Sequence, residues 1–235
     1  MKHFMIYANQ HKDVGLKTTE RIGKYLETKG QRVSVRLMQR EQETDRDPFP
    51  EDADCMIVLG GDGTVLQAVR EKQGKHLPIV GVNLGTLGYM TEIELSNLET
   101  ALDRLVSGDY EQESRMMLEG RIFAKDEELR QGWALNDIVI SRSGSLQIIQ
   151  YKIYVNGMFL NEYNADGVII TTPTGSTGYN LSAGGPLVEP RAKLIMVTPI
   201  CPHTLNQRSI ILSPDDVVEI VIPEGREGKD QTVGV

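Results

Sequence analysis

The feature that most constrains the fold is a short apolar run that stops abruptly at a cluster of glycines. Met56 to Leu59 reads Met-Ile-Val-Leu, and Gly60-Gly61-Asp62-Gly63-Thr64 follows directly. An apolar run of this length is typical of a strand buried on both faces of a parallel sheet. Glycines allow a sharp turn and a close approach of backbone N–H groups to a ligand. The sequence therefore predicts a strand, a glycine loop (residues 60–64) along which phosphates lie, and a helix that begins near Thr64.

One carboxylate, that of Asp62, lies inside the glycine loop. A carboxylate repels a bare phosphate, so its presence requires another partner, either a metal ion or a proton that it accepts. The alternative is local, because Asp between glycines often forms a turn by bonding to its own backbone. A second polar, glycine-rich segment later in the chain favours the functional interpretation.

The first half of the chain alternates predicted strands with predicted helices. Strands are expected at residues 4–8, 33–37, 56–59 and 77–82, and helices at residues 14–29, 64–73 and 96–106. Ser96 and Glu99 have the spacing of a capping box for the last helix, and Gly108 is expected to end it. Residues 39–54 are polar and contain two prolines, which indicates a surface loop. Alternation of this kind implies a parallel sheet that binds ligands at the carboxyl ends of its strands.

The second half changes to the two-residue alternation of β-strands. Such patterns occur at residues 118–123, 138–140, 152–155 and 167–170, and Asn156-Gly157 predicts a tight hairpin turn between two strands. Little helix is expected apart from a turn or two after Thr177. The predicted fold is therefore an α/β N-terminal domain with a parallel sheet at residues 1–108, followed by a mainly antiparallel β domain at residues 109–235.

Further polar groups follow predicted strands. Gly85 to Tyr89 carries two glycines just past a strand end, where it forms either a second wall of a cleft or an ordinary connection. Asn136 and Asp137 stand side by side before a strand, where they either face a cleft or form an Asx turn. Asp137 and Asp166 could each accept hydrogen bonds from ribose hydroxyls.

The most unusual segment is residues 171–186, which is rich in hydroxyl groups and glycines. Short donors of this kind suit the sugar and base edges of a nucleotide better than its phosphates. The alternative is a long polar surface loop. The candidate nucleotide-binding residues of this segment are Thr174, Thr177, Gly178, Tyr179 and Ser182.

Composition excludes some partners. The net charge is −8 and the isoelectric point is near 5.1, without the clustered Lys and Arg that hold nucleic acid. Cys55 and Cys201 match no metal spacing and are interpreted as reduced structural thiols. The sequence shows no signal peptide and no apolar run long enough to cross a membrane. A soluble cytoplasmic protein without nucleic-acid or membrane partners is therefore expected.

Together these motifs resemble those of the bacterial-type NAD kinases (the ATP/polyphosphate-NAD kinase family), over nearly the whole chain. The first motif alone is less specific, because lipid kinases and phosphofructokinases carry similar sequences. The later motifs are the specific ones, namely Gly85-Thr86-Leu87-Gly88-Tyr89, Leu135-Asn136-Asp137, Asp166-Gly167 and the residues from Thr172 to Tyr179 with Ser182, Gly184 and Gly185.

The resemblance implies a kinase that transfers the γ-phosphoryl of ATP to the adenosine 2′-hydroxyl of NAD. Asp62 would accept the hydroxyl proton, and Gly60, Gly61, Gly63 and Thr64 would lie along the phosphates. Asn136 and Asp137 would hold NAD through its ribose, and Thr174, Thr177, Gly178, Tyr179 and Ser182 would line the nucleotide pocket, with Asp166 near the far end of the dinucleotide. The two domains would enclose a cleft. No residue is predicted to bind a metal by itself, and Mg²⁺ or another divalent cation would arrive with ATP.

The resemblance also implies a homotetramer or homodimer. Because the glycine loop contains no lysine, unlike a P-loop, magnesium is expected to supply more of the counter-charge. Family members usually continue for several tens of residues past the equivalent of Val235, so the chain could be a fragment or a degenerate copy. Two other classes stay open, a lipid or sugar kinase and a non-catalytic NAD-binding module.

Overall fold

The computed structural model describes residues 1–38, 49–72, 76–85, 88–124, 127–143, 148–204, 208–223 and 233–234. The chain divides into two compact units, Met1–Gln112 and Glu113–Val235, and each is described here by itself. The sequence placed this boundary slightly earlier, after residue 108.

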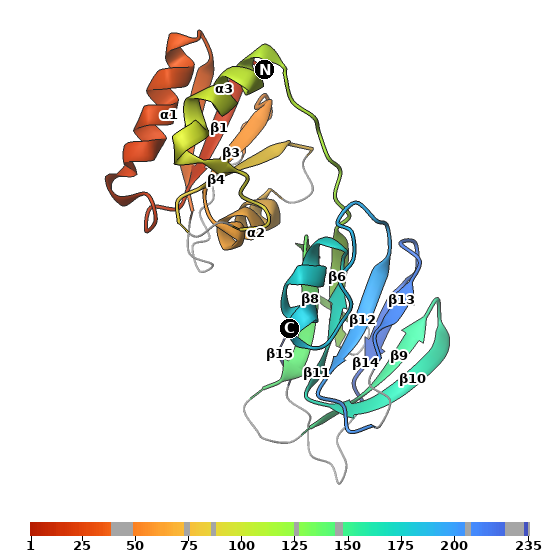
Figure 1. Cartoon of the computed structure of the whole chain (residues 1–235). Helices are drawn as coiled ribbons and strands as arrows, with labels where there is room; N and C mark the ends of the chain where they lie inside the picture. The colour runs from red at the N-terminus through yellow and green to blue at the C-terminus, as the bar shows by residue number, and fades with distance from the viewer. Residues whose placement is uncertain are drawn as a thin grey trace. The chain divides into compact units, whose positions relative to one another are not determined.

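The N-terminal unit contains a five-stranded parallel sheet with the strand order β2-β1-β3-β4-β5 (Figure 1). The strands are β1 (His3–Ala8), β2 (Arg32–Leu37), β3 (Cys55–Gly60), β4 (Ile79–Asn83) and β5 (Ile93–Glu94). The helices are α1 (Lys17–Thr28), α2 (Asp62–Glu71) and α3 (Leu98–Ser107), with short 3₁₀ turns η1 (Val14–Leu16) and η2 (Leu95–Asn97). The predicted α/β domain with a parallel sheet is confirmed.

Both faces of the two central strands are covered, which explains why all residues of β1 and β3 are buried. Phe4, Ile6 and Ala8 of β1 belong to one apolar cluster with Ile22 and Leu26 of α1 and with Leu98, Leu102 and Leu105 of α3. The alternate residue Tyr7 points to the other face, where its hydroxyl donates to Glu71 of α2 at 2.8 Å. Burying each such apolar side chain contributes about 1.5–3 kcal/mol.

Two predicted helix starts are wrong. The first helix begins at Lys17 rather than Val14, because Gly15 and Leu16 adopt left-handed backbone angles that interrupt it. The capping box of Ser96 and Glu99 does not form, since the Ser96 hydroxyl donates to Glu94 at 3.3 Å and α3 has no side-chain cap. Gly108 does end α3 in a left-handed conformation, as expected.

The predicted surface loop at residues 39–54 falls partly outside the described residues. Of its described part, Phe49 is buried, with the Arg36 guanidinium 4.4 Å from the centre of its ring. Phe49 is therefore packed against Arg36 of β2, whereas Glu51, Asp52 and Asp54 of the same segment are exposed, as the prediction expects.

The C-terminal unit is built from antiparallel strands, as predicted (Figure 1). Its largest sheet has the order β13-β12-β11-β8-β15, a second has the order β10-β9-β14, and β6 and β7 form a two-stranded ribbon. The strands are β6 (Leu118–Ala124), β7 (Glu127–Ala134), β8 (Asp137–Arg142), β9 (Ile149–Val155), β10 (Met158–Ala165), β11 (Gly167–Thr171), β12 (Ile195–Ile200), β13 (Ile210–Leu212), β14 (Val218–Val221) and β15 (Val233–Gly234).

The hairpin predicted at Asn156-Gly157 is confirmed. Both residues have positive φ angles of 51° and 77°, and Val155 pairs with Met158 across the turn. Positive φ at both central residues is the type I′ geometry that matches the twist of the strands. The predicted helical turn after Thr177 is also present as α4 (Tyr179–Ser182), and the 3₁₀ turn η3 (Thr174–Thr177) precedes it.

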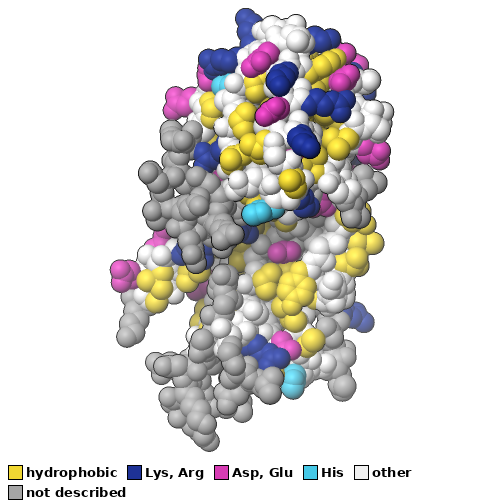
Figure 2. Space-filling view, turned by 90° about the vertical axis from the view of Figure 1, so that its left-hand side faces the viewer, with side chains coloured by type: hydrophobic (Ala, Val, Ile, Leu, Met, Phe, Trp, Pro, Cys, Tyr) yellow, Lys and Arg dark blue, Asp and Glu magenta, His cyan; other side chains and the backbone are white. Residues whose placement is uncertain are grey.

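The charged side chains on the surface of the N-terminal unit are of both signs (Figure 2). On the face drawn in Figure 2, Lys and Arg side chains of the N-terminal unit are mixed with Asp and Glu rather than gathered in one patch. Among the described residues, no helix is long and apolar enough to span a bilayer.

The two cysteines differ in exposure. Cys55 is buried and free, and burial raises the pKa of its thiol to about 12. Cys201 is free but exposed, so its predicted structural role is wrong.

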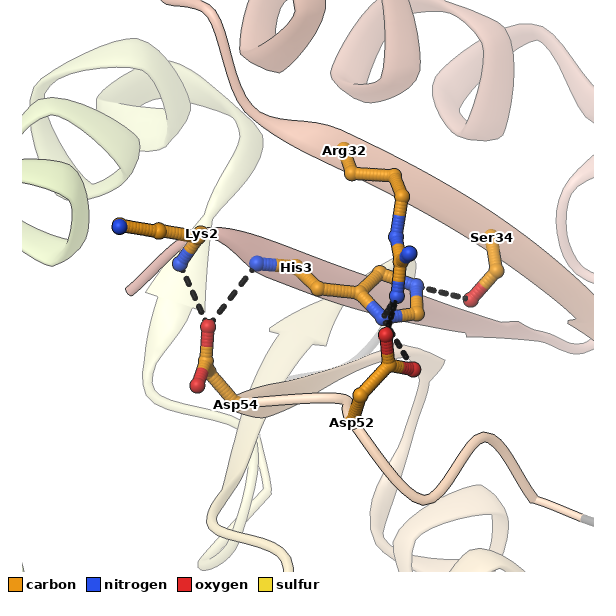
Figure 3. Close-up of polar contacts among 6 residues, drawn as sticks. All are labelled: Lys2, His3, Arg32, Ser34, Asp52 and Asp54. Carbon is orange, nitrogen blue, oxygen red and sulfur yellow. Dashed lines mark hydrogen bonds and ion pairs between the residues drawn. The ribbon is translucent and has the colours of Figure 1, made fainter.

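Figure 3 shows a polar cluster at the amino ends of the strands, the edge opposite the glycine loop. The Asp54 carboxylate accepts hydrogen bonds from the backbone N–H groups of Lys2 at 2.5 Å and His3 at 2.9 Å, which joins β3 to β1. The His3 ring is buried, and its Nε2 lies 3.0 Å from the Ser34 hydroxyl. Burial and the nearby Arg32 guanidinium lower the pKa of His3. This cluster anchors the start of the sheet and holds a neutral imidazole.

Candidate active site

The glycine loop lies where three parallel strands end at one edge of the sheet. The backbone N–H of Asn9, just after β1, donates to Leu59 of β3 at 3.1 Å. On the other side, Leu84 N, just after β4, donates to Gly60 at 2.9 Å. The connections after β1, β3 and β4 are therefore fixed side by side, as the sequence predicted for the carboxyl ends of parallel strands.

Asp62 is the first residue of α2, and its carboxylate is held by backbone groups of the segment that follows β4. Its Oδ2 accepts the N–H of Tyr89 at 2.8 Å, and its Oδ1 accepts the N–H of Met90 at 3.0 Å. Each carboxylate oxygen still has a free lone pair after accepting one hydrogen bond. Asp62 is thus fixed in position and can still accept a proton or contact a cation.

Gly88 is required by this arrangement. A Cβ at position 88 would lie 2.1 Å from Asp62 Oδ1, a distance that no real contact allows. The absence of a side chain at Gly88 lets the backbone of Tyr89 and Met90 reach the carboxylate. Gly85 turns the same segment, since its N–H donates to the Asn83 side chain at 2.7 Å. The predicted second wall therefore contacts the glycine loop directly, although its residues 86 and 87 lie outside the described part of the chain.

Thr64 holds the loop together from inside. It is buried, and its Oγ1 lies 3.3 Å from the Asn9 amide Nδ2 and 3.4 Å from the backbone N–H of Gly61. Gly60 passes so close to it that a Cβ at position 60 would lie 2.2 Å from the Thr64 hydroxyl oxygen. The Thr64 side chain is therefore occupied in shaping the loop, and its predicted contact with the phosphates stays a prediction.

The start of α2 offers free donors. Within the described part of the chain, the backbone N–H groups of Asp62 and Gly63 form no hydrogen bond, because they belong to the first turn of the helix. Gly63 is exposed, and no atom lies within 4 Å of the place of its missing Cβ. Free N–H groups and the positive end of a helix favour an anion such as phosphate.

Sequence reasoning missed one basic group at this site. The Nζ of Lys12, in the loop between β1 and η1, lies 2.8 Å from the position that a Cβ on Gly61 would occupy. The ammonium therefore rests against the glycine loop although it comes from a different segment. The sequence did contain a signal for this contact. In the predicted parallel sheet, the loop after β1, which carries Lys12, must lie beside the loop after β3.

The second group of predicted residues gathers at one end of the β8 and β11 pair. Thr171, the last residue of β11, pairs with Asp137, the first residue of β8. The Asn136 carbonyl accepts the N–H of Thr172 at 2.8 Å and the hydroxyl of Thr171 at 3.0 Å. A Cβ on Gly175 would lie 2.5 Å from this carbonyl oxygen. The turn from β11 into η3 is therefore packed directly on Asn136.

Asn136 and Asp137 have side-chain atoms that lack ordinary partners. Among the described residues, the buried Oδ1 of Asn136 accepts no hydrogen bond. Burial raises the pKa of the Asp137 carboxyl group, which is half-buried. Both side chains lie near Gly178, whose missing Cβ would be 3.5 Å from Asn136 Nδ2 and 3.9 Å from Asp137 Oδ2. A buried amide oxygen without a partner fits a place where a ligand binds, and the roles of Asn136 and Asp137 in binding stay predictions.

The hydroxyl-rich segment divides into an internal part and an exposed part. The side chains of Thr172 and Ser176 are occupied within the unit, since Thr172 Oγ1 donates to Leu135 at 2.6 Å and Ser176 Oγ lies 3.2 Å from both backbone polar atoms of Val188. Asn180 is fully buried and accepts the Thr198 hydroxyl at 2.7 Å. The alternative of a long surface loop is therefore wrong, and these internal bonds fix the shape of the turn.

Most of the predicted pocket residues belong to the exposed part of the hydroxyl-rich segment. Thr177 and Gly178 are half-buried, Tyr179 and Ser182 are exposed, and Thr174 is buried with the Arg115 guanidinium 3.5 Å from its hydroxyl. Thr174 is the exception, because its hydroxyl already has a partner inside the unit. The roles of all five in binding a nucleotide stay predictions.

Asp166 lies apart from this group. Gly167 pairs with Ser141, whereas Thr171 pairs with Asp137, so the length of the strand pair separates Asp166 from Asp137. Four residues of strand correspond to roughly 13 Å. The Asp166 carboxylate instead forms an ion pair with Arg142 at 3.0 Å. Within this unit, Asp137 and Asp166 therefore do not lie at one common point.

Among the described residues, no group of three or more His, Cys, Asp or Glu side chains is placed to hold a metal ion. Magnesium that accompanies a nucleotide needs only one or two protein carboxylates, because phosphate oxygens and water supply the other ligands. The free lone pairs of Asp62 fit that limited requirement.

Comparisons with known proteins agree with these motifs. The ATP-NAD kinase N-terminal domain matches residues 4–110, and the ATP-NAD kinase C-terminal domain matches residues 135–233. The chain is 47% identical over 240 residues to an NAD kinase of Lachnospira eligens, covering 100% of this chain and 82% of that protein. It is 48% identical to an NAD kinase of Lachnoclostridium phytofermentans, covering 98% of this chain and 82% of that protein.

Two solved structures have the same fold. Yeast NADH kinase in complex with NADH superposes with a TM-score of 0.84 at 27% identity, covering 100% of this chain and 78% of that one. An NAD kinase from Archaeoglobus fulgidus in complex with ATP superposes with a TM-score of 0.74 at 28% identity, covering 94% of this chain and 80% of that one. Family match, curated relatives and fold lead to one conclusion. The chain belongs to the NAD kinase family of enzymes.

Proposed function

We propose that the chain transfers the γ-phosphoryl group of ATP to the adenosine 2′-hydroxyl of NAD and so forms NADP and ADP. The observation that most supports this reaction is the start of α2, where the free N–H groups of Asp62 and Gly63 accompany a fixed carboxylate. Free N–H groups at a helix start suit the phosphates of ATP. A carboxylate in the same turn suits a hydroxyl that must lose its proton.

In the proposed reaction the 2′-oxygen forms a bond to the γ-phosphorus. The bond between that phosphorus and the β,γ-bridging oxygen breaks, and its electron pair leaves with ADP. The hydroxyl proton passes to the Asp62 carboxylate. A ribose hydroxyl is too weak an acid to ionise at neutral pH, so this proton moves late in the transfer. Mg²⁺ with ATP would supply positive charge to the phosphate oxygens, and Asp62 could contribute one oxygen ligand.

Asn136 and Asp137 are proposed to hold the ribose of NAD. The Asn136 amide oxygen is buried and has no hydrogen-bond partner among the described residues, and the Asp137 carboxyl group is half-buried. Hydroxyl groups of a bound ribose would satisfy both acceptors. Leaving such acceptors unpaired costs about 1–3 kcal/mol each, which favours binding of a ligand that pairs them.

A coupled assay tests the proposal. The protein is mixed with ATP, Mg²⁺ and NAD, and the NADP formed is reduced by an NADP-specific dehydrogenase. A panel with NADH, a diacylglycerol and fructose 6-phosphate replaces NAD in parallel reactions. Formation of NADP with no lipid or sugar phosphorylation supports the proposal, whereas calorimetric binding of NAD without turnover would assign the chain to non-catalytic NAD binding.

NADH is a second candidate acceptor. It has the same adenosine 2′-hydroxyl, and one structure with the same fold is a yeast NADH kinase with NADH bound. The ratio of kcat/KM for NAD and NADH measures the preference directly.

The proposed assembly is a homotetramer or homodimer. Met158, Phe159 and Leu160 of β10 are consecutive exposed apolar residues, which is a surface that a second copy could cover. Light scattering coupled to size exclusion measures the mass, and a monomer at assay concentration would contradict the proposal.

A further inference from the structure

Lys12 is a charged residue at the glycine loop that lies outside the motifs on which the resemblance rests. Its Nζ lies 2.8 Å from the place where a Cβ on Gly61 would sit, so the ammonium occupies the space that the glycine leaves free. Gly61 has an extended backbone with φ −132° and ψ −171°, which any residue adopts without strain. The backbone at position 61 therefore does not require glycine, and the missing side chain leaves the space in which the Lys12 ammonium lies.

The backbone that carries Lys12 is fixed on both sides. Asn9 is tied to β3 through Leu59 and to the glycine loop through Thr64, at 3.1 and 3.3 Å. Asp13 is buried and accepts the backbone N–H of Thr19, in the first turn of α1, at 2.8 Å. The N–H of Lys12 donates to the Asn9 carbonyl at 2.9 Å. The main chain at Lys12 is thus held in register with the glycine loop, and only the side chain is free to adjust.

The ammonium has no counter-ion in the described part of the chain. No ion pair or hydrogen bond joins the Lys12 side chain to another described residue, whereas Lys24 contacts Glu20 and Lys29 contacts Asp103. The acid of the glycine loop, Asp62, accepts the N–H groups of Tyr89 and Met90 instead. A positive charge therefore lies beside the positive end of α2, and this arrangement favours an anion more strongly than either group alone.

We propose that Lys12 binds the phosphate chain of ATP at the glycine loop and stabilises the negative charge that develops during transfer. The inference rests on the proposed function and adds a residue to it. Phosphoryl transfer depends mostly on positioning and on neutralising charge at the transferred group. Lys12 is exposed in the free protein, so its contribution increases when bound ATP displaces water from it. In this arrangement a lysine from another loop supplies counter-charge that the glycine loop itself lacks.

The test compares three variants. Lys12→Gln removes the charge, Lys12→Arg keeps it, and Lys17→Gln removes the same charge from an exposed lysine at the start of α1. Lys12→Gln is expected to lower kcat/KM for ATP by about tenfold to a hundredfold, in the range of one lost charged donor. Its KM for NAD and its melting temperature should stay near those of the wild type. Lys12→Arg should recover most of the loss, and Lys17→Gln should stay within about twofold.

Binding separates this inference from the proposed function. Calorimetry with Mg²⁺ and the β,γ-imido analogue of ATP measures phosphate binding without turnover. If the wild type binds the analogue but forms no NADP, the proposed function fails. In that case, several-fold weaker binding of the analogue by Lys12→Gln, but not by Lys17→Gln, still supports the inference. A Lys12→Gln variant that matches the wild type in both measurements overturns the inference and leaves the proposed function intact. A wild-type chain that neither binds the analogue nor turns over overturns both.

Discussion

Replacing Asp62 by Asn tests both the chemistry and the architecture of the glycine loop. The carboxylate accepts the N–H groups of Tyr89 and Met90 at 2.8 and 3.0 Å. An Asn side chain has one oxygen and one NH₂ group, so it can accept only one of these two bonds and places a donor against the other N–H. The same change removes the negative charge that would take the proton. Asp62→Asn is therefore expected to affect both stability and turnover.

The expected magnitudes follow from the contacts. A lost hydrogen bond to a charged group costs about 1.5–3 kcal/mol. For a chain of this length one kcal/mol corresponds to about 2–4 °C, so the melting temperature should fall by about 3–12 °C. Turnover should fall by about a hundredfold or more, the lower end of what a proton acceptor contributes. The affinity for NAD should change only a few-fold, because Asn136 and Asp137 are unaltered.

Gly88→Ala is the matched control. Its Cβ would lie 2.1 Å from Asp62 Oδ1, so it should displace the same carboxylate and loosen the same segment without removing the charge. The coupled assay gives kcat and both KM values, and thermal unfolding gives the stability of each variant. Asp62→Asn should lose more turnover than Gly88→Ala at a similar loss of stability. Equal losses of turnover would show that the position of the Asp62 carboxylate, which both variants change, sets the rate rather than its charge, and near-normal turnover of Asp62→Asn would remove it from the chemistry.

Three further outcomes are expected. Asp137→Ala should raise the KM for NAD, and a change confined to the KM for ATP would show that the two substrate sites are reversed. Burial raises the pKa of the Asp137 carboxyl group. The wild-type KM for NAD should therefore rise toward acid pH, whereas the KM of the variant should not. Gly175→Ala should cost about 1–3 kcal/mol of stability, because its Cβ would be 2.5 Å from the Asn136 carbonyl oxygen, whereas Gly132→Ala meets no atom within 4 Å and should not. Burial lowers the pKa of His3 below its ordinary value of 6.5, so below that pH the unfolded chain binds a proton more readily than the folded one. The contribution of His3 to the free energy of unfolding should thus be fully present above pH 6.5 and decrease as the pH falls below 6.5. His3→Gln should remove this part of the pH dependence of chemical unfolding.

Much of the fold was predictable where burial and turn chemistry act locally. The buried strand before the glycine loop and the Asn156-Gly157 turn both appear as expected. Strand β7 was not predicted, since nearly all of its residues are exposed and it shows no alternation of apolar and polar residues. The capping box failed because Ser96 and Glu99 match a pattern that many non-helical turns also match, and here η2 precedes the helix.

The candidate site was predictable residue by residue but not contact by contact. The sequence indicated Asp62, yet nothing near it in the chain shows that Tyr89 and Met90 hold its carboxylate. Lys12 was missed because its position depends on how the loop after β1 rests on the loop after β3. Such contacts arise from the packing of distant segments, and periodicity reports only on neighbours in the sequence.

The contrast between the two cysteines gives the protein a natural attachment point for a spectroscopic label. Cys55 is buried with a thiol pKa of about 12, so it stays protonated and out of reach of maleimide reagents, whereas Cys201 is exposed. A fluorophore therefore attaches to the C-terminal unit without any engineered substitution. Its emission would follow the response of that unit to NAD in real time.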